Sequence, residues 1–205
     1  MQKYDYSYEG SEGYFYPGTT VLKNKLGIKN EDALKIAEKE ITSLKLLMLY
    51  NMPIMDNLDF EHLCKIHKTI FSDIYEWAGN IRTGDFFSKG NSIFCRGQYI
   101  QESASKIFTN LNKEKFLIGL KKQIFIERMA YYMGEINALH PFREGNGRTL
   151  REYFRQLSIN ANFILDFSKT NNEKLLQADI EAFNGKYSGL IEILDKAITV
   201  SGNGI

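Results

Sequence analysis

The segment from His140 to Arg151, HPFREGNGRTLR, decides how this chain folds around its reactive groups. It places a histidine, a carboxylate, a glycine-flanked asparagine and two arginines close together. Beyond Arg148, apolar residues recur at intervals of three and four, which predicts a helix over 148–160 with one buried face. These residues are Leu150, Tyr153, Phe154, Leu157 and Ala161. The stretch 145–147 therefore forms a loop that enters a helix N-terminus.

A helix N-terminus presents unpaired N–H groups and a partial positive charge, so this loop is a candidate anion site. Gly145 and Gly147 let the backbone approach a ligand closely. Arg148 and Arg151 stand in the first turn, where the helix dipole disfavours cations unless an anion is bound. Arg155 continues the same stripe. This arrangement suits a polyphosphate better than a lone carboxylate.

His140 continues an apolar helical stripe, and taken alone it reads as a core histidine. Pro141 changes that interpretation, because the residue before a proline is pushed out of α geometry. His140 is then a helix-end residue beside an anion loop, where a neutral imidazole serves as a general base. Glu144 offers the hard oxygen that magnesium prefers, and a phosphate-bound magnesium needs only one or two protein carboxylates.

These residues closely resemble the motif of the Fic family, HPFx(D/E)GN(G/K)RxxR, and every fixed position matches. The flanking stretches 16–28, 74–82 and 88–90 resemble family segments in the right order, so the resemblance covers most of the chain. It implies a mostly α fold, a Fic-type helical bundle with a small β-hairpin flap near the active-site loop. It also implies transfer of AMP from ATP to a Ser, Thr or Tyr hydroxyl of a target protein or of the chain itself.

The resemblance implies a role for each motif residue. His140 is the base and Glu144 holds Mg²⁺, while ATP is the co-substrate. Nucleotide binding falls to backbone amides and guanidinium groups at Gly145, Asn146, Gly147, Arg148 and Arg151. Phe142 is expected to anchor the loop, and Arg143 to be solvated.

Gly147 favours AMP transfer, since relatives with lysine there hold the nucleotide reversed and transfer a phosphate. Other Fic-like proteins move UMP or phosphocholine, or remove AMP, and the motif alone leaves these open. A nucleotide-responsive binding module without turnover is a third interpretation. His140 argues against it, because a pure binder needs no base.

A hairpin is predicted between residues 81 and 100, with apolar residues on both sides of a Lys-Gly-Asn turn. Its edge would pair with the backbone of an extended peptide, as the family's flap does. The target-binding flap residues are Asp85, Phe86, Phe87, Ser88, Asn91, Ser92, Ile93 and Phe94. Lys89 and Gly90 are candidate nucleotide contacts, although both also suit an ordinary turn.

The composition is that of one globular domain, with 205 residues and 43% hydrophobic side chains. We expect a single Fic-like domain over 1–205, with a core at about 30–200 and a Tyr-rich surface arm at about 1–20. A formal charge of +1 gives no general nucleic-acid footprint. Two cysteines, no long apolar run and no signal-like start favour a cytoplasmic protein without membrane partners. Secretion as an effector stays open.

Apolar residues that recur at intervals of three and four predict several amphipathic helices. The first carries Leu34, Ala37, Ile41, Leu44 and Met48 on one face. A second places His67 in the core and His62 in solvent. Further helices are expected over about 121–139, 172–183 and 188–200.

Regulation is the least determined feature. Many Fic proteins carry an inhibitory helix, (S/T)xxxE(G/N), whose glutamate pairs with the second motif arginine. Ser188 and Glu192 have this spacing and form a candidate inhibitory pair, but Ile193 occupies the last position. In the N-terminal helix Ala33 and Ala37 hold the same spacing with alanines, so we expect that nothing in this helix clamps a motif arginine. A separate antitoxin-like inhibitor is the alternative. The target protein and the oligomeric state stay open.

Overall fold

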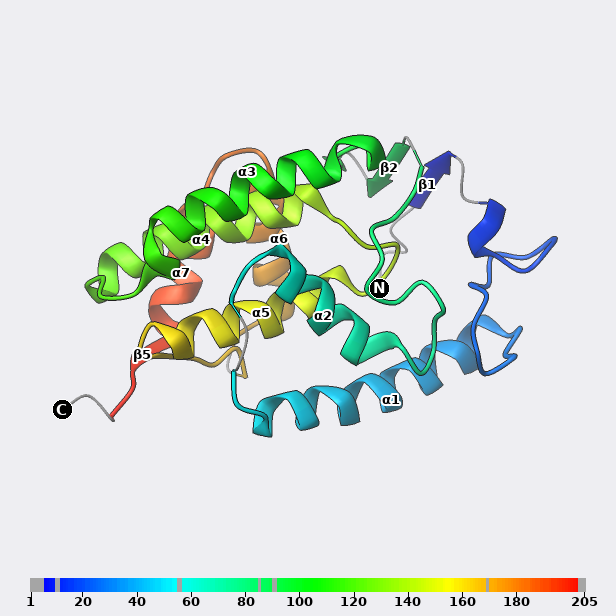
Figure 1. The fold of residues 1–205 in the computed structure, drawn as a ribbon, viewed down its shortest axis with the longest axis horizontal. Helices are drawn as coiled ribbons and strands as arrows, with labels where there is room; N and C mark the ends of the chain where they lie inside the picture. Colours follow the sequence, from blue (N-terminus) through cyan, green and yellow to red (C-terminus); the bar gives the residue numbers. More distant parts are fainter. Residues whose placement is uncertain are drawn as a thin grey trace.

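The computed structural model describes residues 6–9, 12–54, 57–84, 86–89, 92–168 and 170–202. Helices make up most of this part of the chain (Figure 1), which confirms the predicted fold class. The helices are α1 (Glu31–Asn51), α2 (Phe60–Phe71), α3 (Ile100–Lys113), α4 (Lys122–Leu139), α5 (Asn146–Asn160), α6 (Asn172–Phe183) and α7 (Ser188–Ala197). The strands are β1 (Tyr6–Glu9), β2 (Phe86–Lys89), β3 (Ser92–Ile93), β4 (Phe163–Leu165) and β5 (Ile198–Val200).

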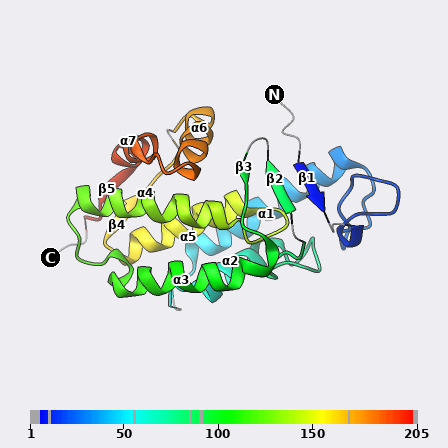
Figure 2. The same cartoon turned by 90° about the horizontal axis from the view of Figure 1, so that it is seen from above.

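Helix α4 is the centre of the bundle. Its buried residues lie around the whole helix, as expected for a helix enclosed by others. They include Phe125, Ile126, Met129, Tyr132, Met133, Ile136 and Leu139. Helices α3, α5, α6 and α7 all pack against α4, and Figure 2 shows α3, α4 and α5 running alongside one another. The last turn of α4 thus delivers residue 140 to one end of a rigid core.

The predicted helix extents agree with the structure except near the end of the chain. The interval 172–183 matches α6, and side-chain caps from Asn30, Asp59 and Asn171 start α1, α2 and α6. The interval 188–200 is wrong in its last turn, because α7 ends at Ala197. Residues 198–200 instead pair with β4 as β5. Pairing with β4 satisfies the backbone hydrogen-bonding groups of this segment. Its residues are largely β-branched and suit a strand, although apolar periodicity predicts a helix.

Helix α1 packs on α2 along one side only and lies along one edge of the bundle (Figure 1). Leu34 is buried as predicted, but Leu44 and Met48 are 64% and 56% exposed. The prediction of a single buried apolar face is therefore wrong at these two positions. No neighbouring element covers this side of α1 in the described chain. Among the described residues, no helix is both long enough and apolar enough to cross a bilayer.

The flap is a three-stranded antiparallel sheet in the order β1-β2-β3. The predicted hairpin is present as β2 and β3, with Ser88 opposite Ile93. The Tyr-rich arm does more than lie on the surface, because its strand β1 pairs with β2 along the full length of both. The described part of the arm is therefore a component of the flap (Figure 2).

Arg82 links the flap to the motif loop from a buried position, 3% exposed. Its Nε donates to the carbonyl oxygen of His140 at 2.7 Å, and its Nη2 donates to the carbonyl oxygen of Cys95. Its backbone N–H donates to the carbonyl oxygen of Pro141 at 2.9 Å. The guanidinium carbon also lies 4.8 Å from the ring centre of Phe87. One side chain thus sets the distance between flap and loop.

We expect Arg82→Met to lower the free energy of unfolding by about 3 kcal/mol, since two carbonyls lose charge-assisted donors in a buried site. Arg96→Met is the matched control, because Arg96 is exposed and nearby. Urea unfolding of both variants measures the difference. Equal midpoints for the two would contradict a structural role for Arg82.

Candidate active site

His140 ends α4 in the left-handed conformation, with φ 44° and ψ 61°. Its backbone N–H still donates to the carbonyl oxygen of Ile136 at 3.3 Å. The departure from α geometry before Pro141 agrees with the sequence expectation. A non-glycine residue in this region is uncommon and is held by its surroundings. The Arg82 bond to the His140 carbonyl supplies part of that restraint.

The His140 ring lies against two flap phenylalanines. Its centre is 3.9 Å from the Phe94 ring in a stacked arrangement and 5.1 Å from the Phe87 ring. Phe94 in turn meets Phe183 of α6 edge-on at 5.6 Å. Both flap phenylalanines are buried, at 2% and 7% exposure. The predicted flap residues Phe87 and Phe94 therefore form the surface that orients the imidazole.

The loop after His140 is closed by a buried amide. The Phe142 N–H donates to Asn146 Oδ1 at 2.9 Å, and Asn146 Nδ2 donates to the Phe142 carbonyl at 2.8 Å. Phe142 is fully buried, which confirms its predicted anchoring role. The Asn146 side chain is engaged within the loop, so what this residue offers a ligand is its backbone N–H.

Gly145 is required by its conformation and by its neighbour. Its φ is +82°, and a Cβ there would lie 2.2 Å from Cζ of Phe71. Any side chain would collide with a buried ring and be strained in addition. Gly147 differs, because a Cβ there would make only an ordinary contact, 3.6 Å from Arg151 Nη1. Its glycine leaves space on the ligand side of the loop.

His67 holds the loop from beneath. Its Nδ1 accepts the Gly79 N–H at 2.8 Å, so Nε2 carries the proton and donates to the Glu144 carbonyl at 2.9 Å. The ring stacks on Phe142 with centres 3.9 Å apart and is fully buried. Burial lowers the pKa of His67 to about 4, so the imidazole is neutral near pH 7. The predicted core histidine is confirmed.

The backbone amides that face a ligand begin one residue later than predicted. The Gly145 N–H is bonded to Oε1 of Glu144 at 2.9 Å. The first ladder bond of α5 runs from the Thr149 N–H to the Gly145 carbonyl at 3.1 Å. The amides of Asn146, Gly147 and Arg148 therefore belong to the first turn, whose donors have no partner within the helix. They form the anion-binding end of α5.

Arg148 is held by an ion pair with α1. Its Nη2 lies 2.5 Å from Oε1 of Glu38, and its Nη1 donates to Oγ1 of Thr42 at 3.1 Å. Tyr75 donates its hydroxyl to the other oxygen of Glu38. The statement that nothing in this helix clamps a motif arginine is therefore wrong. The clamp is Glu38, one residue beyond Ala37, and it holds the first arginine.

Arg151 has a different environment from Arg148. It is exposed to solvent and forms no ion pair with a described acidic side chain. Protein atoms around its guanidinium displace part of the water and lower the pKa of Arg151, Asp179 raises that pKa, and Arg148 lowers it. A guanidinium nevertheless stays charged at neutral pH. Arg155 is already bound by Glu152 through two bonds of 2.8 and 2.7 Å. The open cation of the stripe is Arg151.

A recess of about 460 Å³ surrounds these arginines. Leu47 and Tyr50 of α1 form one side, and Leu165 and Phe167 lie on the other. Two carboxylates, Glu152 and Asp166, line the recess as well, and Glu152 pairs with Arg155. Arg151 is the guanidinium of the recess that stays available to an anionic side chain or phosphate.

Glu144 suits a magnesium ion held mainly by phosphate. Its side chain is 36% exposed, and Oε1 lies 3.8 Å from Arg148 Nη2. No group of three or more His, Cys, Asp or Glu side chains in the described chain forms a metal cage. A single carboxylate beside an anion-binding turn agrees with magnesium, which usually keeps few protein ligands when phosphates bind it.

Some of the predicted flap residues lie outside the described residues, namely Asp85, Gly90 and Asn91. For Phe86, Lys89 and Ser92 the structure describes the backbone within the sheet. Ser88 is 7% exposed, whereas Ile93 is 60% exposed.

In the described chain, Glu192 of the C-terminal candidate pair is bonded to Lys196 and not to Arg151. Ser188 is the first residue of α7, and Glu192 forms an exposed ion pair of 2.7 Å with Lys196 one turn along the same helix.

Two expectations about burial are wrong. Arg143, expected in solvent, is 5% exposed and lies over Phe15 at 5.0 Å, and His62 is 8% exposed with Nε2 donating to Gln156 at 2.7 Å.

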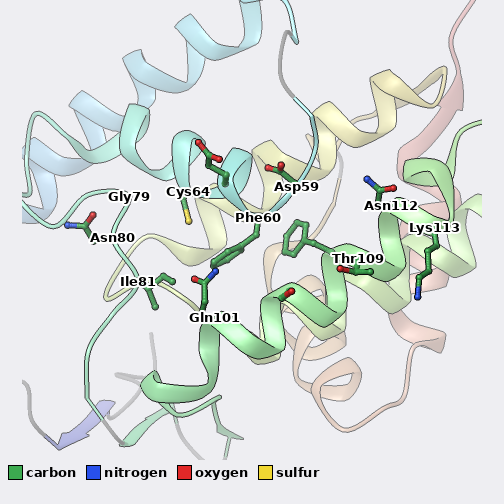
Figure 3. A pocket seen from close by; sticks show the side chains of 13 residues that line it. Asp59, Phe60, Cys64, Gly79, Asn80, Ile81, Gln101, Thr109, Asn112 and Lys113 are labelled. Carbon is green, nitrogen blue, oxygen red and sulfur yellow. The ribbon is translucent and has the colours of Figure 1, made fainter.

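A cavity of about 760 Å³ lies between α2 and α3 (Figure 3). Cys64, Asn80 and Gln101 are among its lining residues, and no residue of 140–151 lines it. Burial raises the pKa of the Cys64 thiol to about 11, which disfavours the reactive thiolate. This cavity is therefore separate from the motif loop.

Comparison with known proteins agrees with this geometry. The family model described as Fic/DOC matches residues 57–157. A Salmonella typhimurium protein named "Probable protein adenylyltransferase Fic" is 37% identical over 191 residues, covering 93% of this chain and 94% of the relative. "Protein adenylyltransferase VbhT" of Bartonella schoenbuchensis is 39% identical over 94% of this chain. The chain spans only 40% of the length of VbhT.

Solved structures share the fold over nearly the whole chain. Bartonella tribocorum BepC with bound AMPPNP superposes with a TM-score of 0.84 and 28% identity, covering 92% of this chain and 97% of BepC. The N-terminal Fic domain of a Bartonella quintana effector with bound ADP gives a TM-score of 0.86 at 28% identity, covering 93% and 96%. On the near full-length similarity to the Salmonella relative, together with the motif and the fold, this chain belongs to the Fic/DOC family.

Proposed function

We propose that this chain transfers AMP from ATP to a hydroxyl group of a protein side chain and releases pyrophosphate. The observation that carries the proposal is the convergence of three groups at one loop. These are an oriented imidazole at His140, the first-turn amides of α5 and the open guanidinium of Arg151. The relatives named as protein adenylyltransferases and the structures holding AMPPNP and ADP support the same reaction.

In this reaction His140 accepts the proton of the attacking hydroxyl. The oxygen attacks the α-phosphorus, and the bond to the oxygen that bridges the α- and β-phosphates breaks. The stacked Phe94 and Phe87 rings fix the plane of the imidazole before the substrate arrives. Positioned proton transfer of this kind supplies about 10²- to 10⁴-fold in rate.

The phosphates are held by backbone and guanidinium donors. The amides of Asn146, Gly147 and Arg148 face the anion at the positive end of α5. Arg151, open to solvent, binds the far end of the polyphosphate. Arg148 stays tied to Glu38, so its charge is shared between a carboxylate and the ligand. In phosphate transfer such positioning and charge stabilisation dominate catalysis.

Glu144 would hold a magnesium ion, which neutralises phosphate charge when bound. The carboxylate is exposed enough to reach a ligand, and its bond to the Gly145 N–H orients it toward the loop.

Gly147 supports AMP transfer over phosphate transfer, because the relatives that transfer a phosphate carry lysine at this position. UMP transfer, phosphocholine transfer and AMP removal are the alternatives that a labelled product excludes. Two unpaired cysteines favour a reducing compartment, and we place the reaction in the cytoplasm.

A separate inhibitor is the partner that the surface suggests. Leu47 and Met48 of α1 are 60% and 56% exposed, and Leu47 lines the recess that contains Arg151. We propose an antitoxin-like helix that covers this face and brings a carboxylate to Arg151. Coexpression with short open reading frames beside the gene tests this. Copurification that Leu47→Asp does not weaken would contradict the placement.

The reaction itself is tested with ATP labelled at the α-phosphate in parallel with ATP labelled at the γ-phosphate. Each is incubated with magnesium and the purified chain, alone and with cell lysate. Protein-bound label from the α-phosphate alone is expected. Label from the γ-phosphate would establish phosphate transfer instead.

We expect His140→Ala to reduce transfer at least about 100-fold while ATP affinity stays within about twofold, because the base acts in the transition state. Labelling rates and calorimetric ATP titration measure the two quantities. Undiminished labelling would remove His140 from its assigned role.

We expect Arg151→Ala to weaken ATP binding by about 10-fold and to slow transfer, since a charge-assisted contact to phosphate is worth about 1.5–3 kcal/mol. Lys196→Ala is the control, because Lys196 pairs with Glu192 on α7, away from the loop. If Arg151→Ala bound ATP as tightly as the control, Arg151 would lie outside the site.

A further inference from the structure

The edge of β2 that β3 leaves open is already occupied by a strand of the chain itself. Strand β2 is the middle strand of its sheet, with β3 on one side and β1 on the other. Tyr6, Ser7, Tyr8 and Glu9 pair with Lys89, Ser88, Phe87 and Phe86. An extended peptide added to β2 would need this same edge, since its other edge pairs with β3. Strand β1 thus occupies the position that a peptide paired with β2 would take.

The register places position 8 on the catalytic side of the sheet, opposite a residue that lies against the base. Position 8 is paired with Phe87, whose ring centre lies 5.1 Å from the His140 ring. Directly opposed residues of an antiparallel pair share a face of the sheet. Position 8 therefore belongs to the face turned toward His140, whereas positions 7 and 9 belong to the opposite face.

Position 6 shares the catalytic face but lies farther along the strand. It pairs with Lys89 at the turn end of β2, two residues beyond Phe87. Tyr8 is thus the tyrosine whose register partner touches the base. The catalytic face of this strand carries tyrosine at both positions, and a phenol is one of the acceptor groups of the proposed reaction.

We propose that β1 is an acceptor segment in cis and that Tyr8 is the residue the chain modifies on itself. The phenolic oxygen forms a bond to the α-phosphorus of ATP, the bond to the bridging oxygen breaks, pyrophosphate leaves, and the phenolic proton passes to His140. This inference rests on the proposed AMP transfer. It adds that a protein substrate that pairs with β2 must displace β1, so self-modification and docking at that edge exclude each other.

The test uses the full chain with magnesium and α-labelled ATP, followed by peptide mapping by mass spectrometry. One AMP moiety is expected on Tyr8, and Tyr8→Phe should reduce self-labelling at least about 10-fold. Tyr6→Phe is the matched control on the same face and should label at close to the wild-type rate. The fraction labelled per unit time should not change with protein concentration over a roughly tenfold range.

Self-labelling on another residue, undiminished labelling of Tyr8→Phe, or a rate proportional to protein concentration would overturn the assignment. The test distinguishes the proposed reaction from the proposed site. Label on lysate proteins without label on the chain would contradict self-modification and support AMP transfer. Absence of α-label from every protein would contradict both proposals.

Discussion

The position of the reactive loop depends on the neutral imidazole of His67. This fully buried ring accepts from the Gly79 amide and donates to the Glu144 carbonyl, so it joins the turn after α2 to the loop before α5. A protonated ring would present a second donor to an N–H, and burial makes that form costly. The backbone of residues 140–145 belongs to no helix or strand. Its order therefore comes from this ring, from Arg82 and from Asn146.

Two arginines in the same helical turn have divergent roles because of what lies opposite them. Arg148 faces Glu38 and Thr42 of α1, and it packs over the Phe71 ring at 4.7 Å. Arg151 faces a recess with apolar walls and keeps its charge open. Fixing Arg148 and leaving Arg151 available separates a positioning charge from a ligand-binding charge. The sequence spacing alone treats the two as equivalent.

The sequence predicted the features that depend on interactions between residues close together in the chain. The motif, the break at Pro141, the helix of 172–183 and the hairpin follow from periodicity, proline geometry and turn chemistry. The residues that it missed act across long separations. Glu38 lies 110 residues before Arg148, and the contact of Arg82 with His140 also joins distant segments.

The errors in burial have the same origin. The sequence predicts His62 and Arg143 to be exposed because the residues that cover them, Gln156 and Phe15, are distant in the sequence. Burial of Leu44 and Met48 is predicted wrongly because apolar spacing does not show how much of a helix surface the neighbouring elements cover. Helix α3 is missing from the predicted helices, although Ile100, Ala104, Phe108 and Leu111 recur at intervals of four and three and are all buried. This omission is a local pattern that was missed, not a long-range effect.

The pairing of β1 with β2 also sets an order of events during synthesis. Strand β1 and its partner lie about 80 residues apart, and both precede the motif helix in the chain. Because domains emerge from the ribosome N-terminal end first, all three strands of the flap are made before His140 and Arg151. Strand β1 can therefore pair with β2 before the base and the phosphate-binding turn have been made. A peptide from another protein that pairs with β2 would have to compete with β1 for this edge from the start.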